Sequence, residues 1–258
     1  MSGRNTAEQW ETNAAAYADL IGGKGTPHHQ HILNPCVEKM LGEIAGKRVL
    51  DAGCGEGYLS RYYSRKGALV TGVDISRRFI SIAASIARNE GVSVEFRQSD
   101  LCNLSGIPDG YFDVVLCNLV LMNVPCLDEA LASIRRVLRQ SGILVLSVVH
   151  PAFDFYGPGR WELGDKDTVT GRRTGKHFIM DNYLDETVHE RVWKSRDGSD
   201  FPAPITFFHR PISRYVSALI RAGFSLEALE EPVPDSTDDF FERERRIPTF
   251  LVIKSRRV

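Results

Sequence analysis

Short apolar runs alternate, over the first 150 residues, with segments in which apolar side chains recur every three or four positions. The runs predict strands at residues 48–52, 68–73, 92–96, 112–117 and 143–149. The periodic segments predict helices at residues 6–20, 35–44, 58–66, 76–91 and 127–139. Strands that alternate with helices at this spacing build parallel βαβ units, so the pattern predicts a doubly wound α/β sheet.

This rhythm stops after residue 150. Residues 151–208 are rich in aromatic and charged side chains, with one short strand predicted at 187–193. The segment is longer than an ordinary connection, and we interpret it as an insertion folded over the carboxyl edge of the sheet. A helix at 211–221 and strands at 224–229 and 248–254 follow, while 235–244 is interpreted as a solvated loop. The single domain then divides into an N-terminal helical lid, a core, the insertion and a C-terminal part of the sheet: 1–46, 47–150, 151–208 and 209–258.

Charge and cysteine content narrow the class of protein. The net charge of -1 and the pI of about 6.7 show no basic surplus, so nucleic acid is disfavoured as a partner. No apolar run approaches the ~20 residues of a membrane span, and the N-terminus has no signal-peptide pattern. The five cysteines are scattered without a C-x-x-C pair, which predicts reduced thiols in a cytoplasmic protein and no zinc site.

The strongest local signal is the glycine-rich stretch Asp-Ala-Gly-Cys-Gly-Glu-Gly at residues 51–57. Its glycines let the chain turn sharply after a strand and bring bare backbone against a ligand. Asp74 ends the next strand, 19 residues after Gly55, close to the ~20 expected for an acid that binds ribose hydroxyls. Asp51 disfavours a pyrophosphate and suits a cationic, amino-bearing ligand. Asp100, after the third strand, is placed to accept a hydrogen bond from an adenine amine.

Together with Ser-Asp-Leu at 99–101 and residues 112–118 and 138–144, these motifs resemble the ordered motifs of class I S-adenosylmethionine-dependent methyltransferases of the small-molecule type. The resemblance covers roughly residues 10–149. It implies a Rossmann-like, mainly parallel seven-stranded sheet with an antiparallel last strand. It also implies transfer of a methyl group from S-adenosyl-L-methionine to an O, N or S atom of a small molecule, leaving S-adenosyl-L-homocysteine. The cofactor-binding residues implied are Trp10, Tyr17, Asp51, Gly53, Cys54, Gly55, Tyr58, Asp74, Ile75, Asp100, Leu101 and Asn118.

The resemblance also implies how these residues divide the cofactor. Residues 53–57 would face the methionine part, Asp74 the ribose, Asp100 and Leu101 the adenine, and Asn118 the sulfonium. The helix predicted at residues 6–20, which carries Trp10 and Tyr17, resembles an N-terminal helix that closes over the cofactor. The alternative is that Trp10 and Tyr17 are ordinary core residues.

The acceptor side carries weaker signals. The residues after the fourth strand lack the [DN]-P-P-[YF] motif of enzymes that methylate nucleobase amines or glutamine, which favours a small diffusible acceptor. His150 and His209 are candidate bases near strand ends, with structural hydrogen bonding as the alternative. Tyr156 and Trp161 are candidates for an acceptor pocket in the insertion, and Arg210 for a carboxylate clamp. No metal site is predicted, because the histidines at 28, 29 and 31 lack a further ligand at useful spacing.

Other functions stay open at this point. A methyltransferase acting on RNA or protein, and a non-catalytic S-adenosylmethionine-binding partner or sensor, share the same motifs. A nicotinamide-dependent oxidoreductase is disfavoured by the G-x-G-x-G pattern and by Asp51. A monomer or a homodimer is expected. The motifs name neither the acceptor nor the pathway.

Overall fold

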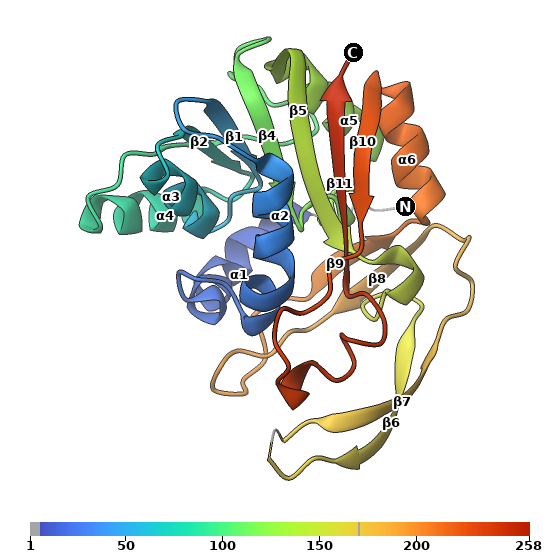
Figure 1. Ribbon diagram of the computed structural model, residues 1–258. Coiled ribbons are helices and arrows are strands. Elements are labelled where there is room, and N and C mark those ends of the chain that lie inside the picture. Colours follow the sequence, from blue (N-terminus) through green and yellow to red (C-terminus); the bar gives the residue numbers. More distant parts are fainter. Residues whose placement is uncertain (1–5, 170) are drawn as a thin grey trace.

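A seven-stranded sheet forms the centre of the computed structural model, which describes residues 6–169 and 171–258 (Figure 1). The strand order is β10-β11-β5-β4-β1-β2-β3. The first five strands in sequence are parallel neighbours, whereas β11 is antiparallel to both β5 and β10, as predicted. The strands are β1 (Arg48–Ala52), β2 (Leu69–Asp74), β3 (Glu95–Gln98), β4 (Phe112–Asn118), β5 (Leu138–Val149), β10 (Phe224–Glu230) and β11 (Phe250–Arg257).

Helices cover both faces of this sheet. The α-helices are α1 (Thr6–Ile21), α2 (Asn34–Leu41), α3 (Tyr58–Arg65), α4 (Arg77–Asn89), α5 (Leu127–Val137) and α6 (Ile212–Arg221). One core lies between the sheet and α5 and α6, and a second lies between the sheet and α2 and α3. Alternate residues of β5 enter the two cores: Leu144 and Leu146 the first, Ile143 and Val145 the second. None of the helices in the described ranges has the length and apolar content needed to cross a membrane.

Several boundaries differ from the prediction. Residues 29–33 form a π-helix, η1 (His29–Leu33), that runs directly into α2 rather than a loop. The strand predicted at 143–149 begins at Leu138, because Leu138 already pairs with Phe112 of β4, and α5 therefore ends at Val137. The strand predicted at 92–96 is observed as β3 at residues 95–98, closer to Asp100, because these are the residues that pair with β2. The N-terminal lid was predicted at residues 1–46, of which 1–5 lie outside the described residues. In the described part, α2 packs against one face of the sheet.

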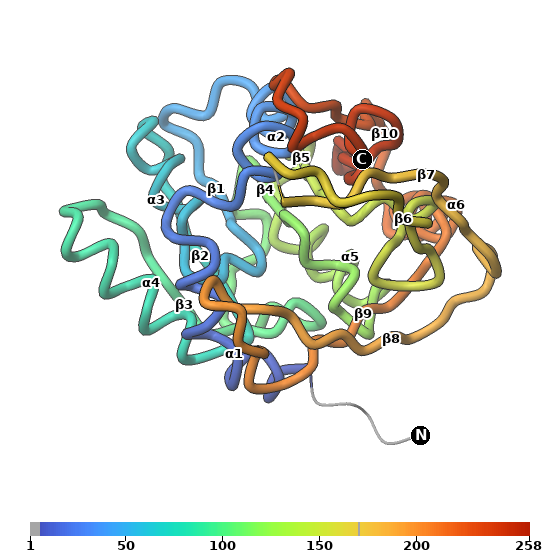
Figure 2. The backbone as a smooth tube through the Cα atoms, turned by 90° about the horizontal axis from the view of Figure 1, so that it is seen from below, coloured from blue at the N-terminus to red at the C-terminus, as the bar shows by residue number. Residues whose placement is uncertain are grey.

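The insertion contains two antiparallel hairpins where the sequence predicted one strand. They are β6 (Arg160–Lys166) with β7 (Arg173–Ile179), and β8 (Thr187–Arg191) with β9 (Ile205–His209). The first hairpin is mostly exposed and has no apolar periodicity to reveal it. Three short 3-10 helices lie between these elements: η2 (Leu121–Asn123), η3 (Pro151–Phe153) and η4 (Asp239–Phe241). Figures 1 and 2 show that α1, the insertion and the segment between β10 and β11 lie beyond the carboxyl edge of the parallel strands.

Candidate active site

A tight turn between β1 and α3 opens the candidate site. Gly53, Gly55 and Gly57 have φ angles of 82°, 54° and 79°, which only glycine adopts without strain. A Cβ atom on Gly53 would lie 2.5 Å from the side chain of Val120. The turn therefore brings backbone into close contact with whatever fills the adjacent cavity.

This first cavity lies at the carboxyl ends of β1, β2 and β4. All twelve residues that the sequence assigned to the cofactor line it. Four carboxylates also line it, those of Asp51, Glu56, Asp74 and Asp100, and no lysine or arginine does so among the described residues. An acidic wall of this kind repels a pyrophosphate and attracts a cationic ligand. The residues present therefore fit a ligand that carries ammonium and sulfonium groups.

Asp74 is held in place by two backbone donors. Gly55 N–H donates to Oδ2 at 3.0 Å, and Ser76 N–H donates to Oδ1 at 2.9 Å. Each oxygen keeps a further lone pair, so the carboxylate can still accept from both hydroxyls of a ribose diol. The carboxylate is only 7% exposed, and this burial raises the pKa of Asp74 to about 6.

Two more acids lie deeper in the cavity wall. Asp51 accepts a hydrogen bond from Ser60 Oγ at 2.6 Å, and burial raises its pKa to about 7. Glu56 Oε2 accepts from the buried Arg61 at 2.9 Å, whereas Oε1 is buried and has no partner in the described part of the chain. Glu56 is thus an open acceptor for a ligand ammonium group. Glu56 is not among the twelve residues predicted to bind the cofactor, although its place inside the glycine turn was a visible signal.

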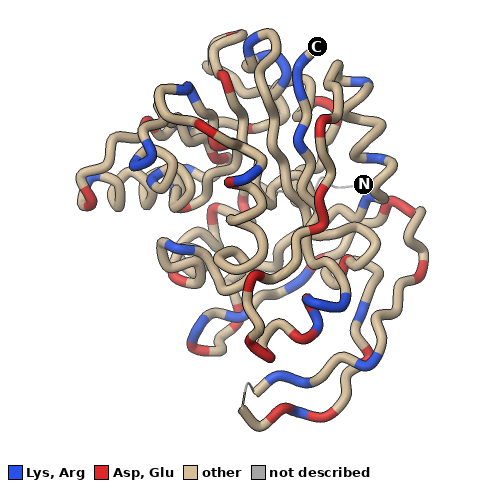
Figure 3. The backbone as a smooth tube through the Cα atoms, in the orientation of Figure 1, with Lys and Arg blue, Asp and Glu red and all other residues tan. Residues whose placement is uncertain are grey.

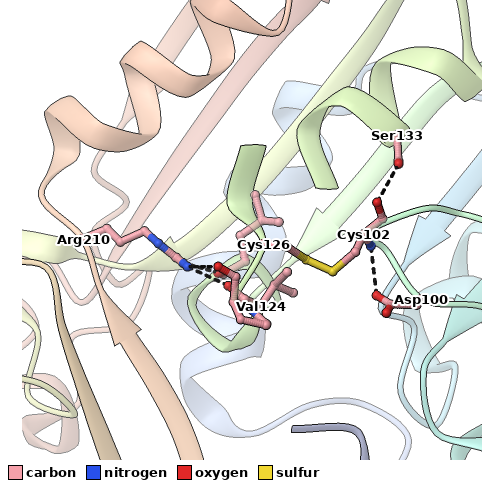
Figure 4. The surroundings of a disulfide bond; sticks show 8 residues. Asp100, Cys102, Val124, Cys126, Ser133 and Arg210 are labelled. Atoms are coloured by element: carbon pink, nitrogen blue, oxygen red, sulfur yellow. Dashed lines mark hydrogen bonds between the residues drawn. A yellow bond between two sulfur atoms is a disulfide. The ribbon is translucent and has the colours of Figure 1, made fainter. Parts of the chain in front are cut away.

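The third strand leads into the side of the first cavity that Asp100 lines, where a disulfide joins Cys102 and Cys126 (Figure 4). The prediction that all thiols are reduced is therefore wrong. The two cysteines are 24 residues apart, and only the fold places their Cα atoms 5.9 Å from each other. Asp100 accepts from the backbone N–H of Cys102 at 2.9 Å. Asp100 and the two sulfurs offer ligand atoms within 4.8 Å of one another, but disulfide sulfurs are not the thiolates that bind metals.

A second cavity of about 420 Å³ adjoins the first. Aromatic side chains from the insertion form much of its wall, namely Phe155, Tyr156, Trp161 and Trp193. Tyr156 and Trp161, both assigned to the acceptor from the sequence, thus lie together. Five residues line both cavities, and we call them the junction: Trp10, Tyr17, His29, Leu119 and Asn123.

His29 is the junction residue whose protonation the structure fixes. Its Nδ1 accepts a hydrogen bond from the backbone N–H of Thr26 at 3.2 Å and lies 2.8 Å from Thr26 Oγ1. Burial lowers the pKa of His29 to about 4, so the ring is neutral at pH 7. A backbone N–H can only donate, so Nδ1 carries no proton and Nε2 does. His29 therefore offers an N–H donor at the junction, whereas the sequence had drawn attention to it only as a possible metal ligand.

The two predicted bases are structural. The ring of His150 is 1% exposed, contacts Glu231 Oε1 through Nε2 at 2.8 Å, and accepts from Ala152 N–H through Nδ1. His209 is also 1% exposed and contacts Asp154 Oδ2 and the Tyr183 carbonyl with its two nitrogens. Neither histidine lines either cavity. Each ring nitrogen already has a protein partner, so neither ring offers a free nitrogen to a ligand in the cavities.

Arg210 is structural as well. Its guanidinium is buried and donates to the carbonyls of Leu121, Val124 and Pro125 at 2.9, 2.7 and 3.2 Å. Figure 4 shows it reaching the loop that carries Val124. Arg210, predicted as a carboxylate clamp, does not line the second cavity. Its donors instead hold the loop that borders the first cavity.

Known proteins share this architecture. A family model described as a methyltransferase domain matches residues 50–146. An uncharacterized protein of Haemophilus influenzae is 30% identical over 240 residues, which cover 88% of this chain and 89% of that protein. The crystal structure of an S-adenosylmethionine-dependent methyltransferase from Mesorhizobium loti is 27% identical, with a TM-score of 0.69, and the match covers 92% of this chain and all of that one.

A third relative is similar over a shorter stretch. The ubiquinone biosynthesis O-methyltransferase of Actinobacillus pleuropneumoniae is 31% identical over 134 residues, 49% of this chain and 57% of that enzyme. The match thus spans only about half the length of that relative. The shared motifs, the sheet order and the acidic first cavity lead to one conclusion: the chain belongs to the class I methyltransferases and uses S-adenosylmethionine as its methyl donor.

Proposed function

We propose that this enzyme methylates a small molecule bound in the second cavity. The observation that carries the proposal is the junction, where an aromatic-walled cavity of about 420 Å³ meets the acidic first cavity. That volume lies within the range of sites for small organic ligands. The proposal places the acceptor between the aromatic side chains of the insertion and the junction residues.

The side chains around the junction mainly align the acceptor and exclude water. S-adenosylmethionine supplies a methyl group that its positively charged sulfur already activates. Alignment of two reactants can lower the barrier by up to ~7–11 kcal/mol. Trp10 and Tyr17 pack edge to face at 5.5 Å and both contact Phe79 of α4, so α1 covers the junction with a rigid aromatic surface.

The titratable residues of the junction do not suit proton removal. They are Tyr17 and His29 among the described residues that line both cavities. Burial raises the pKa of Tyr17, so its hydroxyl stays protonated. His29 presents Nε2–H, which donates rather than accepts. These features support an acceptor atom that arrives with a free lone pair and is positioned by His29.

Replacing His29 tests this positioning role. We expect His29→Phe to lower the rate of methyl transfer by about 10- to 100-fold, because the phenyl ring has no donor. His29→Gln should keep most of the activity, because its amide N–H can reach the place of Nε2–H. Initial rates of label transfer from methyl-labelled S-adenosylmethionine measure both variants, and titration of S-adenosylhomocysteine checks that the first cavity is intact. Equal loss in both variants would contradict the role of the Nε2–H donor.

The proposed function as a whole is tested by where the methyl group goes. The enzyme is incubated with methyl-labelled S-adenosylmethionine and a cell extract divided into dialysable and macromolecular fractions. We expect label to enter the dialysable fraction. Label confined to RNA or protein would reject the small-molecule acceptor. Binding of S-adenosylmethionine without transfer to any fraction would favour a sensor or partner protein.

A further inference from the structure

We propose that the acceptor is a flat aromatic molecule with a carboxylate, and that Arg243 binds this carboxylate at the end of the second cavity away from the junction. The inference rests on the proposed function and adds the chemical class of the acceptor. It also assigns to Arg243 the clamp that the sequence had suggested for Arg210.

The charges on the second cavity favour an anion. Three cationic side chains line it, those of Arg172, Lys194 and Arg243, against the single carboxylate of Glu244. Glu244 is already engaged by His28 and by Arg172, each at 3.0 Å. Despite its burial, these hydrogen bonds lower the pKa of Glu244 to about 2, so it stays ionised and paired. The negative charge of Glu244 is therefore balanced by His28 and Arg172 of the cavity wall and does not repel an anionic ligand strongly.

Arg243 differs from the other two cations. Lys194 is largely exposed and pairs with Asp200 at 2.6 Å, and Arg172 pairs with Glu244. The guanidinium of Arg243 is half-buried, yet within the described residues it makes no hydrogen bond or ion pair. Its only side-chain partner of note is the Trp161 ring, 6.0 Å from its central carbon. A partly desolvated cation that no carboxylate contacts directly is unfavourable, which is the state expected of a group that binds an anionic ligand.

The position of Arg243 sets the orientation of the ligand. Arg243 lines the second cavity but not the first, whereas the junction residues line both. Tyr156 and Trp193 line the same cavity and stack on each other, with ring centroids 5.5 Å apart and planes 29° apart. A planar acceptor can therefore lie along aromatic faces, with its carboxylate at Arg243 and its reacting atom beside His29.

The surrounding fold keeps Arg243 at this wall. The segment between β10 and β11 lies beside the β6–β7 hairpin, and Figure 3 shows Lys and Arg on both. Arg246 ties the two together by donating to the carbonyls of Gly175 and Lys176. Arg246 also lies over the Trp161 ring, at 5.3 Å, but it pairs with Glu242 and does not line the cavity. Arg245, on the same segment, instead donates to the carbonyl of Asp238 and does not line the cavity. It is therefore the matched control: the same residue type, without access to the ligand.

The test compares acids with their amides. Wild-type protein saturated with S-adenosylhomocysteine is titrated by calorimetry with indole-3-acetate and 2-naphthoate, and with the primary amide of each. We expect at least one acid to bind about tenfold or more tightly than its amide, because a bidentate guanidinium–carboxylate pair is lost in the amide. Arg243→Gln should reduce this preference to less than about threefold. Arg245→Gln should leave it unchanged, and Arg243→Lys should retain part of it.

The outcomes separate this inference from the proposed function. Equal affinity for acids and amides, no binding of either, or a preference that survives in Arg243→Gln would each overturn the role of Arg243. S-adenosylhomocysteine affinity, measured on every variant, shows that the protein remains folded. Label entering only macromolecules would reject the proposed function itself, whatever the preference between acids and amides.

Discussion

Asp74→Ala is expected to weaken binding of S-adenosylhomocysteine by at least about 100-fold while the protein stays folded. The carboxylate has one free lone pair on each oxygen for a ribose hydroxyl, beside the bonds from Gly55 and Ser76. A hydrogen bond to a charged group contributes about 1.5–3 kcal/mol, and about 1.4 kcal/mol corresponds to a factor of ten in affinity. Two such bonds therefore account for the expected loss. Calorimetric titration measures the affinity.

Asp113→Ala is the matched control for this variant. Asp113 is the second residue of β4 rather than the last residue of a strand; it accepts from Arg48 N–H at 2.8 Å and pairs with Arg139, also at 2.8 Å. It does not line the first cavity. We expect a lower melting temperature for Asp113→Ala and an affinity within about twofold of wild type. Unchanged affinity in Asp74→Ala, with circular dichroism like that of wild type, would remove Asp74 from the ribose site.

The cofactor side of the molecule was predictable because its signals are local. Buried parallel strands read as apolar runs; β1 leads directly into the glycine turn, and β2 ends at Asp74. The glycine turn between β1 and α3 has its own sequence signature. Consequently, the motifs alone predicted twelve residues of one site, and the fold brings all twelve together around one cavity.

The acceptor side was not predictable because it depends on pairs distant in sequence. His150 and His209 look like free histidines at strand ends, but their partners Glu231 and Asp154 are 81 and 55 residues away. Nothing local distinguishes a histidine that will be engaged on both nitrogens from one that will face a cavity. The disulfide between residues 102 and 126 is hidden for the same reason.

Arg243 was hidden by its charged neighbourhood. The segment 235–244 reads as a solvated acidic loop, yet Phe241 is 3% exposed and Glu244 is buried against Arg172. Charge runs usually face solvent. Here the hairpin of the insertion, which has little periodicity of its own, covers the segment and turns one side of it toward a cavity.

Affinity for S-adenosylmethionine is also expected to fall as the pH is lowered from 8 to 5.5. Burial raises the pKa of Asp51 to about 7 and that of Asp74 to about 6, so both acids take up protons over this range in the free enzyme. The ligand is a cation and its ribose requires an acceptor, so it binds the ionised forms. Binding must then release protons, and linkage through two groups predicts a decrease on the order of 100-fold. Calorimetry at several pH values, in buffers of different ionisation enthalpy, measures both the affinity and the proton release.

The Asp51→Asn variant separates the two contributions. Its amide oxygen can still accept from Ser60 Oγ, which donates to Asp51 at 2.6 Å, so the cavity wall keeps its shape. Without the group that titrates near pH 7, the affinity of this variant should depend on pH only below about pH 6, through Asp74. Because the carboxylate charge is also lost, affinity at pH 8 should be lower than in wild type, and less so for S-adenosylhomocysteine, which lacks the sulfonium charge. A wild-type affinity that stays constant from pH 8 to 5.5 would mean that neither acid needs to ionise, and the electrostatic account of the first cavity would be wrong.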